Sequence, residues 1–267
     1  MEKMVVIKDL RKIFNRNTID EKIAMDGIEL EVRRGEFITV IGSNGAGKTT
    51  LLNLIAGTYL PDEGKIFINN DEVTLLPEYR RAKYLGRIFQ NPLMGTASSM
   101  TIQENLSMAE IRGKIRGLSW GVTKRQKERY RELLKALELG LETRLSDRVS
   151  LLSGGQRQCL TLLMATLSLP KLLLLDEHTA SLDPKTAEKV IELTHRIIRE
   201  NELTTIMVTH NMNQAINLGD RMIMLHEGKI QFDIQGDEKK RLTVEEVVKR
   251  FGEKLEDETL LCKPVDG

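Results

Sequence analysis

Cysteine is scarce in this sequence. Cys159 and Cys262 are the two cysteines among 267 residues, too few for a disulfide framework or a cysteine-bound metal set. We therefore expect reduced thiols, which is the usual state in the cytosol.

Long apolar runs and an excess of one charge are also missing. No run approaches the roughly 18 residues of a membrane-spanning helix, and the amino terminus lacks the apolar stretch and cleavage site of a signal peptide. The 40 Lys and Arg residues nearly balance the 39 Asp and Glu residues, which argues against nucleic acid as a partner. What remains is a chain with the ordinary 40% hydrophobic content of a soluble protein, long enough for a sizeable core.

A glycine-rich loop is the most informative stretch. The residues that fit the phosphate-binding pattern G-x-x-x-x-G-K-[ST] are Gly42, Ser43, Asn44, Gly45, Ala46, Gly47, Lys48 and Thr49. The apolar residues 37–41 before them predict a buried strand, and residues 50–56 after them predict a helix. A glycine-rich turn that matches by chance would not need both flanking elements. The pattern has no second copy, so we expect one nucleotide-binding cassette.

This position between a strand and a helix suits a phosphate. Glycines let backbone N–H groups wrap the anion closely, and the helix N-terminus adds a favourable partial charge. Lys48 is expected to reach the β- and γ-phosphates, and Thr49 to bind Mg²⁺. The loop by itself therefore predicts a nucleotide phosphate and no more specific ligand.

A second signal is an apolar strand that ends in two carboxylates. Residues 172–175 are all leucine and are followed by Asp176 and Glu177. Asp176, at the carboxyl end of the strand, is placed to hold Mg²⁺ directly or through water. Glu177 is placed to polarise the water that attacks the γ-phosphate. Two acids would also suit the start of a helix, but that explanation weakens once a phosphate-binding loop lies upstream.

A third signal is the stretch Leu152-Ser153-Gly154-Gly155-Gln156. Ser153 and Gln156 have the spacing of a helix capping box. Two glycines in the first helical turn, however, cost about 1 kcal/mol each relative to alanine. A capping box does not need them, whereas backbone N–H groups that approach a phosphate closely would.

The rest of the chain predicts an α/β fold. Apolar strands alternate with helices, which indicates a largely parallel sheet covered on both faces. Residues 91–165 are expected to form a helical insertion, with a capping box at Thr101 and a densely charged helix over 124–139. We expect an ATPase domain over residues 1–235 and a C-terminal helix with a polar tail over 236–267.

Basic residues gather before and along the charged helix of the insertion. They are Arg112, Lys114, Arg116, Lys124, Arg125, Lys127, Arg129 and Arg131, and the single tryptophan, Trp120, lies among them. A solvated helix face is the simpler explanation of such a run. A surface near anionic lipid headgroups is the alternative.

In this order, Gly42 to Thr49, Leu152 to Gln156 and Leu172 to Glu177 resemble the ATP-binding subunit of an ABC transporter, over residues 1 to about 235. The five residues from Leu152 are highly specific to that family. The resemblance implies a P-loop NTPase core with a mostly parallel sheet, an antiparallel β subdomain and an inserted α-helical subdomain. It also implies an ATPase that uses ATP and Mg²⁺.

The resemblance assigns roles to further residues. Gln90 matches the family's Q-loop glutamine, which senses Mg²⁺ and the membrane partner, and His210 matches the switch histidine that contacts the γ-phosphate. Ser181-Leu182-Asp183 matches the D-loop. Phe14 lies where the family has an adenine-stacking aromatic, although a core residue at a strand end is an equal alternative.

These matches give three sets of expected site residues. The catalytic set is Glu177, His210 and Gln90. The metal-binding set is Thr49, Gln90 and Asp176. The nucleotide-binding set is Phe14, Gly42, Ser43, Asn44, Gly45, Ala46, Gly47, Lys48, Thr49, Thr50, Ser153, Gly154, Gly155, Gln156 and Asp183.

Two departures from the common pattern narrow the resemblance. Most relatives have proline after the catalytic glutamate, where this chain has His178. The segment 89–97 is also unusual. Both features resemble a less-studied branch of bacterial importers, whose companion binding proteins take aromatic amino acids or similar small solutes. We assign His178 no catalytic role on this basis.

In this family, the resemblance implies, two cassettes pair head to tail. ATP then lies between the P-loop of one chain and the signature stretch, Ser153 to Gln156, of the other. The implied partners are a second copy of this chain, a transmembrane permease and an extracytoplasmic solute-binding protein, and the implied location is peripheral, at the cytoplasmic face of the cell membrane. A stand-alone soluble ABC ATPase in assembly or repair is the competing interpretation. A P-loop kinase or GTPase has no use for the signature stretch.

Overall fold

The structure of the chain is a computed structural model that describes residues 2–113 and 121–251. The expectations for Lys114, Arg116, Trp120, Cys262 and the polar tail lie outside these residues. The described chain forms two compact units. The first contains the residues before 82 together with those after 203, and the second contains residues 82–203.

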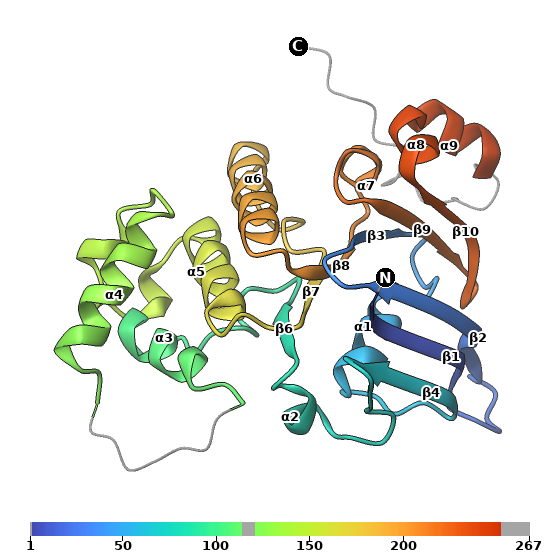
Figure 1. Ribbon diagram of the computed structural model, residues 1–267, viewed down its shortest axis with the longest axis horizontal. Helices are drawn as coiled ribbons and strands as arrows, with labels where there is room; N and C mark the ends of the chain where they lie inside the picture. Colours follow the sequence, from blue (N-terminus) through green and yellow to red (C-terminus); the bar gives the residue numbers. More distant parts are fainter. Residues whose placement is uncertain (1, 114–120, 252–267) are drawn as a thin grey trace. The chain divides into compact units, whose positions relative to one another are not determined.

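The first unit contains a four-stranded antiparallel sheet with the strand order β2-β1-β4-β5 (Figure 1). Its strands are β1 (Lys3–Phe14), β2 (Lys22–Arg33), β4 (Glu63–Ile68) and β5 (Asp71–Glu72). Along the second half of β2, buried Ile28, Leu30 and Val32 alternate with exposed residues. This period of two is typical of a strand that buries one face. The expected antiparallel β subdomain is therefore confirmed.

The first unit also contains the parallel strands that carry the glycine-rich loop. Strand β3 (Phe37–Ile41) pairs in parallel with β8 (Thr204–Val208) and with β9 (Arg221–His226), and β10 (Lys229–Gln235) is antiparallel to β9. Every residue of β3 and β8 is buried, as expected for strands of a covered parallel sheet. Helix α1 (Lys48–Ala56) follows the loop, and Gly57 caps its C-terminus with a φ of +84°, a conformation that suits glycine.

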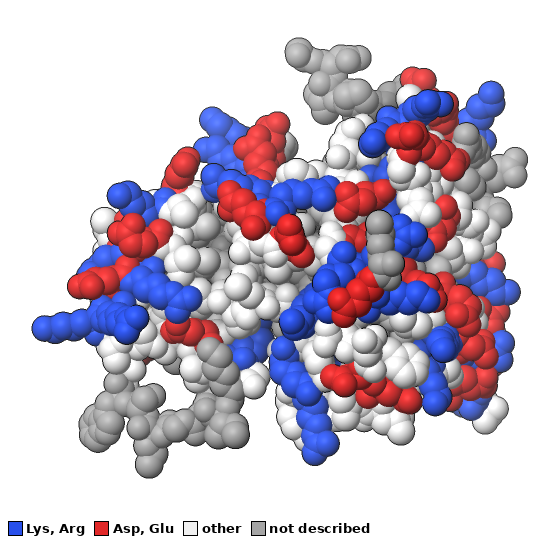
Figure 2. All heavy atoms as spheres, viewed as in Figure 1, with Lys and Arg blue, Asp and Glu red and all other residues white. Residues whose placement is uncertain are grey.

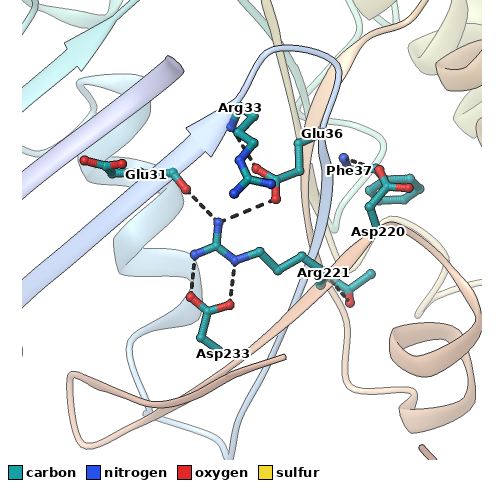
Figure 3. Close-up of polar contacts among 8 residues, drawn as sticks. Glu31, Arg33, Glu36, Phe37, Asp220, Arg221 and Asp233 are labelled. Carbon is teal, nitrogen blue, oxygen red and sulfur yellow. Dashed lines mark hydrogen bonds and ion pairs between the residues drawn. The ribbon is translucent and has the colours of Figure 1, made fainter. Parts of the chain in front are cut away.

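Arg221 joins the two sheets of the first unit (Figure 3). Its guanidinium pairs with both carboxylate oxygens of Asp233 on β10, and its Nη1 atom donates to the carbonyl oxygen of Glu31 on β2 at 2.7 Å. The neighbouring Asp220 accepts a hydrogen bond from the backbone N–H of Phe37 at 2.9 Å. These contacts fix the start of β3, the strand that leads into the glycine-rich loop.

Helix α7 and the helices after β10 pack on the same core as β3, the strand before the glycine-rich loop. Helices α7 (Met212–Asn217), α8 (Gly236–Arg241) and α9 (Val244–Phe251) belong to the first unit. Ile41 of β3 and Leu242 and Val247, near α8 and α9, share one apolar cluster. Lys239 of α8 is buried, and its ammonium donates to three carbonyl oxygens at the end of α7 and just after it, those of Ile216, Leu218 and Gly219.

The second unit combines one parallel strand pair with helices (Figure 1). Strand β6 (Leu85–Ile88) pairs in parallel with β7 (Leu172–Asp176). Its helices are α3 (Ile102–Glu110), α4 (Lys124–Lys135), α5 (Gly154–Thr166) and α6 (Pro184–Glu200), and short 3₁₀ turns lie at 141–143 and 149–151. The capping box expected at Thr101 is present. The expected charged helix ends four residues early, at Lys135. Together with the parallel strands of the first unit, this unit confirms the expected α/β fold, which has a mostly parallel sheet and an inserted set of helices.

Two residues of the basic run, Arg112 and Arg129, have partners within the described part of the insertion. Arg112 is half-buried and donates to the carbonyl oxygens of Met164 and Ala165 near the end of α5, so it does not belong to a surface patch. Arg129 pairs with Glu110. Figure 2 shows basic and acidic side chains interspersed over α4. Within residues 2–113 and 121–251, no helix has both the length and the apolar character that crossing a membrane requires.

Candidate active site

The glycine-rich loop needs its first and last glycines for steric reasons. Gly42 has a φ of +151° and Gly47 a φ of +103°, both outside the range that residues with a side chain favour. A Cβ atom on Gly42 would lie 2.2 Å from the carbonyl oxygen of Leu225, and one on Gly47 would lie 2.6 Å from that of Ala24. The loop is thus held tightly between neighbouring backbones, with a shape that only glycine at these positions allows.

Lys48 is held over this loop. Its side chain belongs to a residue only 6% exposed, and its Nζ atom lies 2.8 Å from the carbonyl oxygen of Gly42 and 3.0 Å from that of Ser43. The adjacent Thr49 is exposed. Helix α1 begins at Lys48 from Gly47, which has no side chain to cap the first N–H groups. A loop with this lysine at the N-terminus of a helix is suited to bind an anion.

The switch-histidine candidate lies at the same sheet edge as the loop. Strands β3 and β8 are parallel neighbours, so their carboxyl ends share one edge, and the N–H of Thr209 donates to the carbonyl oxygen of Val40 at 3.1 Å. His210 follows directly and is half-buried. The hydroxyl of Thr209 accepts from the N–H of Asn211 at 3.0 Å, which fixes the turn that presents His210.

Phe14 stands at the end of β1 and is half-buried. Its ring packs edge-on against Tyr59, with centroids 5.3 Å apart and planes at 76°. The ammonium of Lys12 lies 5.6 Å from the Phe14 ring centroid. The contact with Tyr59 was not predictable from the sequence, because no local pattern connects a residue after α1 with the end of β1.

The second unit brings together the glutamine and the carboxylates. Gln90 follows β6, while Asp176 ends β7 and Glu177 follows it. Since these strands are parallel neighbours, the three side chains come from one sheet edge. The Gln90 Nε2 atom donates to the Glu177 Oε2 atom at 3.2 Å. Asp176 is buried, and its Oδ2 atom lies 3.8 Å from the Nη2 atom of Arg87.

Glu177 has an unusual backbone conformation. Its φ of +43° lies in the left-handed region, which costs a residue other than glycine roughly 1 kcal/mol or more. A proline at position 178 would push Glu177 towards an extended conformation instead. Histidine at 178 is compatible with the observed backbone.

His178 is enclosed beside Glu177. It is 2% exposed, and burial lowers its pKa to about 4, so the imidazole is neutral at pH 7. Its Nε2 atom lies 3.2 Å from the hydroxyl oxygen of Thr194 on helix α6. Thr194 is a partner that the sequence did not reveal.

The signature stretch begins helix α5 with a capping box. The Ser153 hydroxyl oxygen accepts from the N–H of Gln156 at 3.3 Å, and the Gln156 side chain accepts from the N–H of Ser153 at 3.2 Å. A Cβ atom on Gly155 would lie 2.2 Å from the Cγ2 atom of Thr186. Close packing between helices α5 and α6 is therefore one reason for glycine here, beside the expected approach to a phosphate. Asp183 caps α6, and its hydrogen bonds with Thr186 lower its pKa.

These features define a class of protein. The structure has a P-loop between a strand and a helix, and a parallel strand that ends at Asp176 and is followed by Glu177. That combination is typical of P-loop nucleoside triphosphatases.

The comparisons define the family within this class. The family profile described as ABC transporter matches residues 25–180, and this chain belongs to the ABC transporter family as an ATP-binding subunit. It is therefore an ATPase. The chain is 45% identical over 248 residues to the tyrosine transport ATP-binding protein of Clostridioides difficile. The aligned residues cover 93% of this chain and 98% of that relative. It is 34% identical to the glycine betaine/carnitine/choline transport ATP-binding protein OpuCA of Bacillus subtilis, over 93% of this chain and 62% of that one.

Solved structures agree with the fold. The dimeric post-hydrolysis structure of the ATP-binding cassette MJ0796 bound to ADP and phosphate is 30% identical, with a TM-score of 0.75 over 87% of this chain and 98% of that one. The ADP conformation of MJ1267, a cassette of an ABC transporter, is 25% identical, with a TM-score of 0.74 over 90% of this chain and 93% of that one.

Proposed function

We propose that this chain is the ATP-hydrolysing subunit of a bacterial importer for tyrosine or a similar aromatic amino acid. The observation that carries the proposal is the 45% identity to a tyrosine transport ATP-binding protein along nearly the whole of both chains. The Asp-Glu-His sequence at 176–178 and the unusual segment 89–97 support the same branch of importers. The chain would work at the cytoplasmic face of the membrane, bound to a permease that receives solute from an extracytoplasmic binding protein.

In this proposal, the loop residues 42–50 hold the phosphates of ATP. Lys48 contributes its positive charge to the β- and γ-phosphates, and Phe14 stacks on the adenine ring. The oxygen donors of Thr49, Asp176 and Gln90 are of the kind that Mg²⁺ takes, and the bound ion would neutralise phosphate charge.

The chemical step needs a base and a γ-phosphate sensor. Glu177 accepts the proton of the attacking water, and Gln90, which donates to its carboxylate, keeps that oxygen oriented. His210 donates to the γ-phosphate. Ser153 to Gln156 and Asp183 act on the nucleotide of a second copy of this chain, paired head to tail, so closure on ATP requires two chains.

An uptake assay tests the transport function. Cells that lack this chain should accumulate radiolabelled tyrosine poorly, and the wild-type chain should restore uptake whereas Glu177→Gln should not. Uptake of a charged amino acid such as lysine is the matched control and should not change. Normal tyrosine uptake in the deletion strain, with defective uptake of another solute, would refute tyrosine as the transported solute. It would leave the assignment of the chain as a transport ATPase unchanged.

The competing interpretation is a stand-alone ABC ATPase in assembly or repair. The transport-associated relatives disfavour it, since both compared curated proteins are transport ATP-binding proteins. Co-expression with the permease encoded beside it separates the two. The chain should sediment with membranes and be released by detergent, and full recovery in the supernatant beside an intact permease would favour the assembly role.

A further inference from the structure

His178 is the residue of the carboxylate site to which neither the sequence nor the family resemblance gives a role. Its imidazole is enclosed, and the Nε2 atom lies 3.2 Å from the Thr194 hydroxyl oxygen on helix α6. Its backbone lies inside a tight turn, because the N–H of Ala180 donates to the carbonyl oxygen of Glu177 at 3.0 Å. His178 therefore links the turn after Glu177 to a helix that is 17 residues long.

The direction of this hydrogen bond follows from the second partner of Thr194. The Thr194 hydroxyl oxygen lies 2.7 Å from the carbonyl oxygen of Val190, which can only accept. A hydroxyl has one proton, so it donates to Val190 and must accept from His178. The neutral imidazole thus carries its proton on Nε2. This arrangement fixes the ring tautomer and the ring plane together.

Glu177 needs such an anchor because its own backbone is strained. Its φ of +43° persists only where the surrounding structure holds it. The carboxylate must also meet the Gln90 Nε2 atom at 3.2 Å. A turn without a fixed residue after Glu177 would let the carboxylate move away, and a displacement of about 1 Å is enough to cost a factor of about a hundred in rate.

We propose that His178 is a positioning residue for Glu177, and that its Nε2–H···Oγ1 hydrogen bond to Thr194 holds the turn that aims the Glu177 carboxylate. The inference rests on the assignment of Glu177 as the base in the proposed function. His178 itself exchanges no proton during turnover and touches no substrate.

The main test removes the hydroxyl and keeps the shape. Thr194→Val in the full chain should lower kcat for ATP hydrolysis about ten- to a hundredfold, with KM for ATP unchanged. Thr166→Val is the matched control, because Thr166 is also buried on a helix and donates to the carbonyl four residues earlier, that of Leu162, at 2.9 Å. It has no histidine partner and should keep the wild-type kcat.

Two further variants examine the histidine. His178→Ala should reduce kcat as Thr194→Val does, and the double variant should be no slower than either, because one hydrogen bond is lost in each case. His178→Gln keeps an N–H donor near the Nε2 position and should recover most of the rate. A role in packing alone would lower stability in these variants without lowering kcat, and that result overturns the proposal.

The Glu177→Gln background separates this inference from the proposed function. If His178 acts through Glu177, adding Thr194→Val to Glu177→Gln should leave the residual turnover unchanged. If Thr194→Val lowered the turnover of Glu177→Gln by the same factor as it lowers that of the wild type, the His178–Thr194 pair would act on a group other than Glu177. If Glu177→Gln alone kept the wild-type rate, the base assignment would fail first.

Discussion

Arg81 closes the end of the helix that begins at Lys48. Its guanidinium is fully buried and donates to the carbonyl oxygens of Leu54 and Ile55, at 2.6 and 3.0 Å, in the last turn of α1. Two further carbonyl oxygens, of Thr74 and Leu76, complete the set at 2.9 and 2.8 Å. Burial lowers the Arg81 pKa to about 10, and it stays charged at pH 7. The cation lies where the helix dipole favours it.

Replacement of this cation should destabilise the first unit. We expect Arg81→Met to reduce the free energy of unfolding by about 3 kcal/mol or more, because several buried carbonyl oxygens lose their donor. Urea denaturation at pH 7 measures the change. Arg80→Met is the control, since Arg80 is exposed on the same helix, α2 (Glu78–Arg81), and should change stability little. Equal effects of the two variants would contradict the role of Arg81.

Loss of the base should trap a nucleotide-bound dimer. Glu177→Gln keeps the size of the side chain but cannot accept a proton, which slows hydrolysis by about 10²–10⁴-fold. Size-exclusion chromatography should then show a dimer with ATP and a monomer with ADP. The shift should disappear when Ser153→Arg is added, because a large cation blocks the second chain. Wild-type turnover in Glu177→Gln would direct attention to His210.

Substitutions at Ser153 should separate helix capping from nucleotide recognition. The Ser153 oxygen accepts the capping bond from Gln156, and its hydroxyl proton can still be donated outwards. Ser153→Asp keeps the cap but places a negative charge where we propose a γ-phosphate. We expect stability near that of the wild type with ATP turnover abolished. Ser153→Ala should instead lose about 1 kcal/mol of stability, and calorimetry with an ATPase assay distinguishes the two losses.

Acid should destabilise the chain through His178. The pKa of His178 falls from 6.5 to about 4 on folding, so the unfolded chain binds the extra proton between these values. Stability therefore rises with pH across this window and is lost as the pH falls from 6.5 towards 4. From pH 7 to pH 5 we expect this group to remove about 2 kcal/mol. Urea midpoints should fall less over this range in His178→Gln than in the wild type, and equal falls would refute the assignment.

Local signals explain why much of the fold was predictable. The glycine-rich loop, the leucine strand before Asp176 and the capping box at Thr101 each lie within a few consecutive residues, where periodicity and turn chemistry act directly. The C-terminal helix α9 was predicted for the same reason, and its capping bond from the Glu246 N–H to the Thr243 hydroxyl is present. Helix α8 was missed because its sequence, Gly-Asp-Glu-Lys-Lys-Arg, resembles a polar loop.

The contacts that orient the site were not predictable in this way. Arg81 donates to carbonyl oxygens 26 and 27 residues earlier in the chain, and His178 bonds to Thr194, 16 residues later. Such pairs depend on how elements pack, and no spacing in the sequence marks them. Gly155 shows a related limit, because the sequence indicated a glycine requirement but not the Thr186 methyl group that contributes to it. The roles of the site residues towards ATP and Mg²⁺ remain predictions.

The ammonium of Lys239 also determines where this protein can be shortened or fused. It donates to three main-chain oxygens at the end of α7 and just after it, and α7 is the helix that follows His210. Leu242 and Val247 belong to the same buried apolar cluster as Met212 and Met224. A fragment trimmed after residue 235 would expose those methionines to water and leave the oxygens without their cation. A minimal cassette for expression or domain exchange should therefore keep the chain through α9, with any tag or joint placed beyond Phe251.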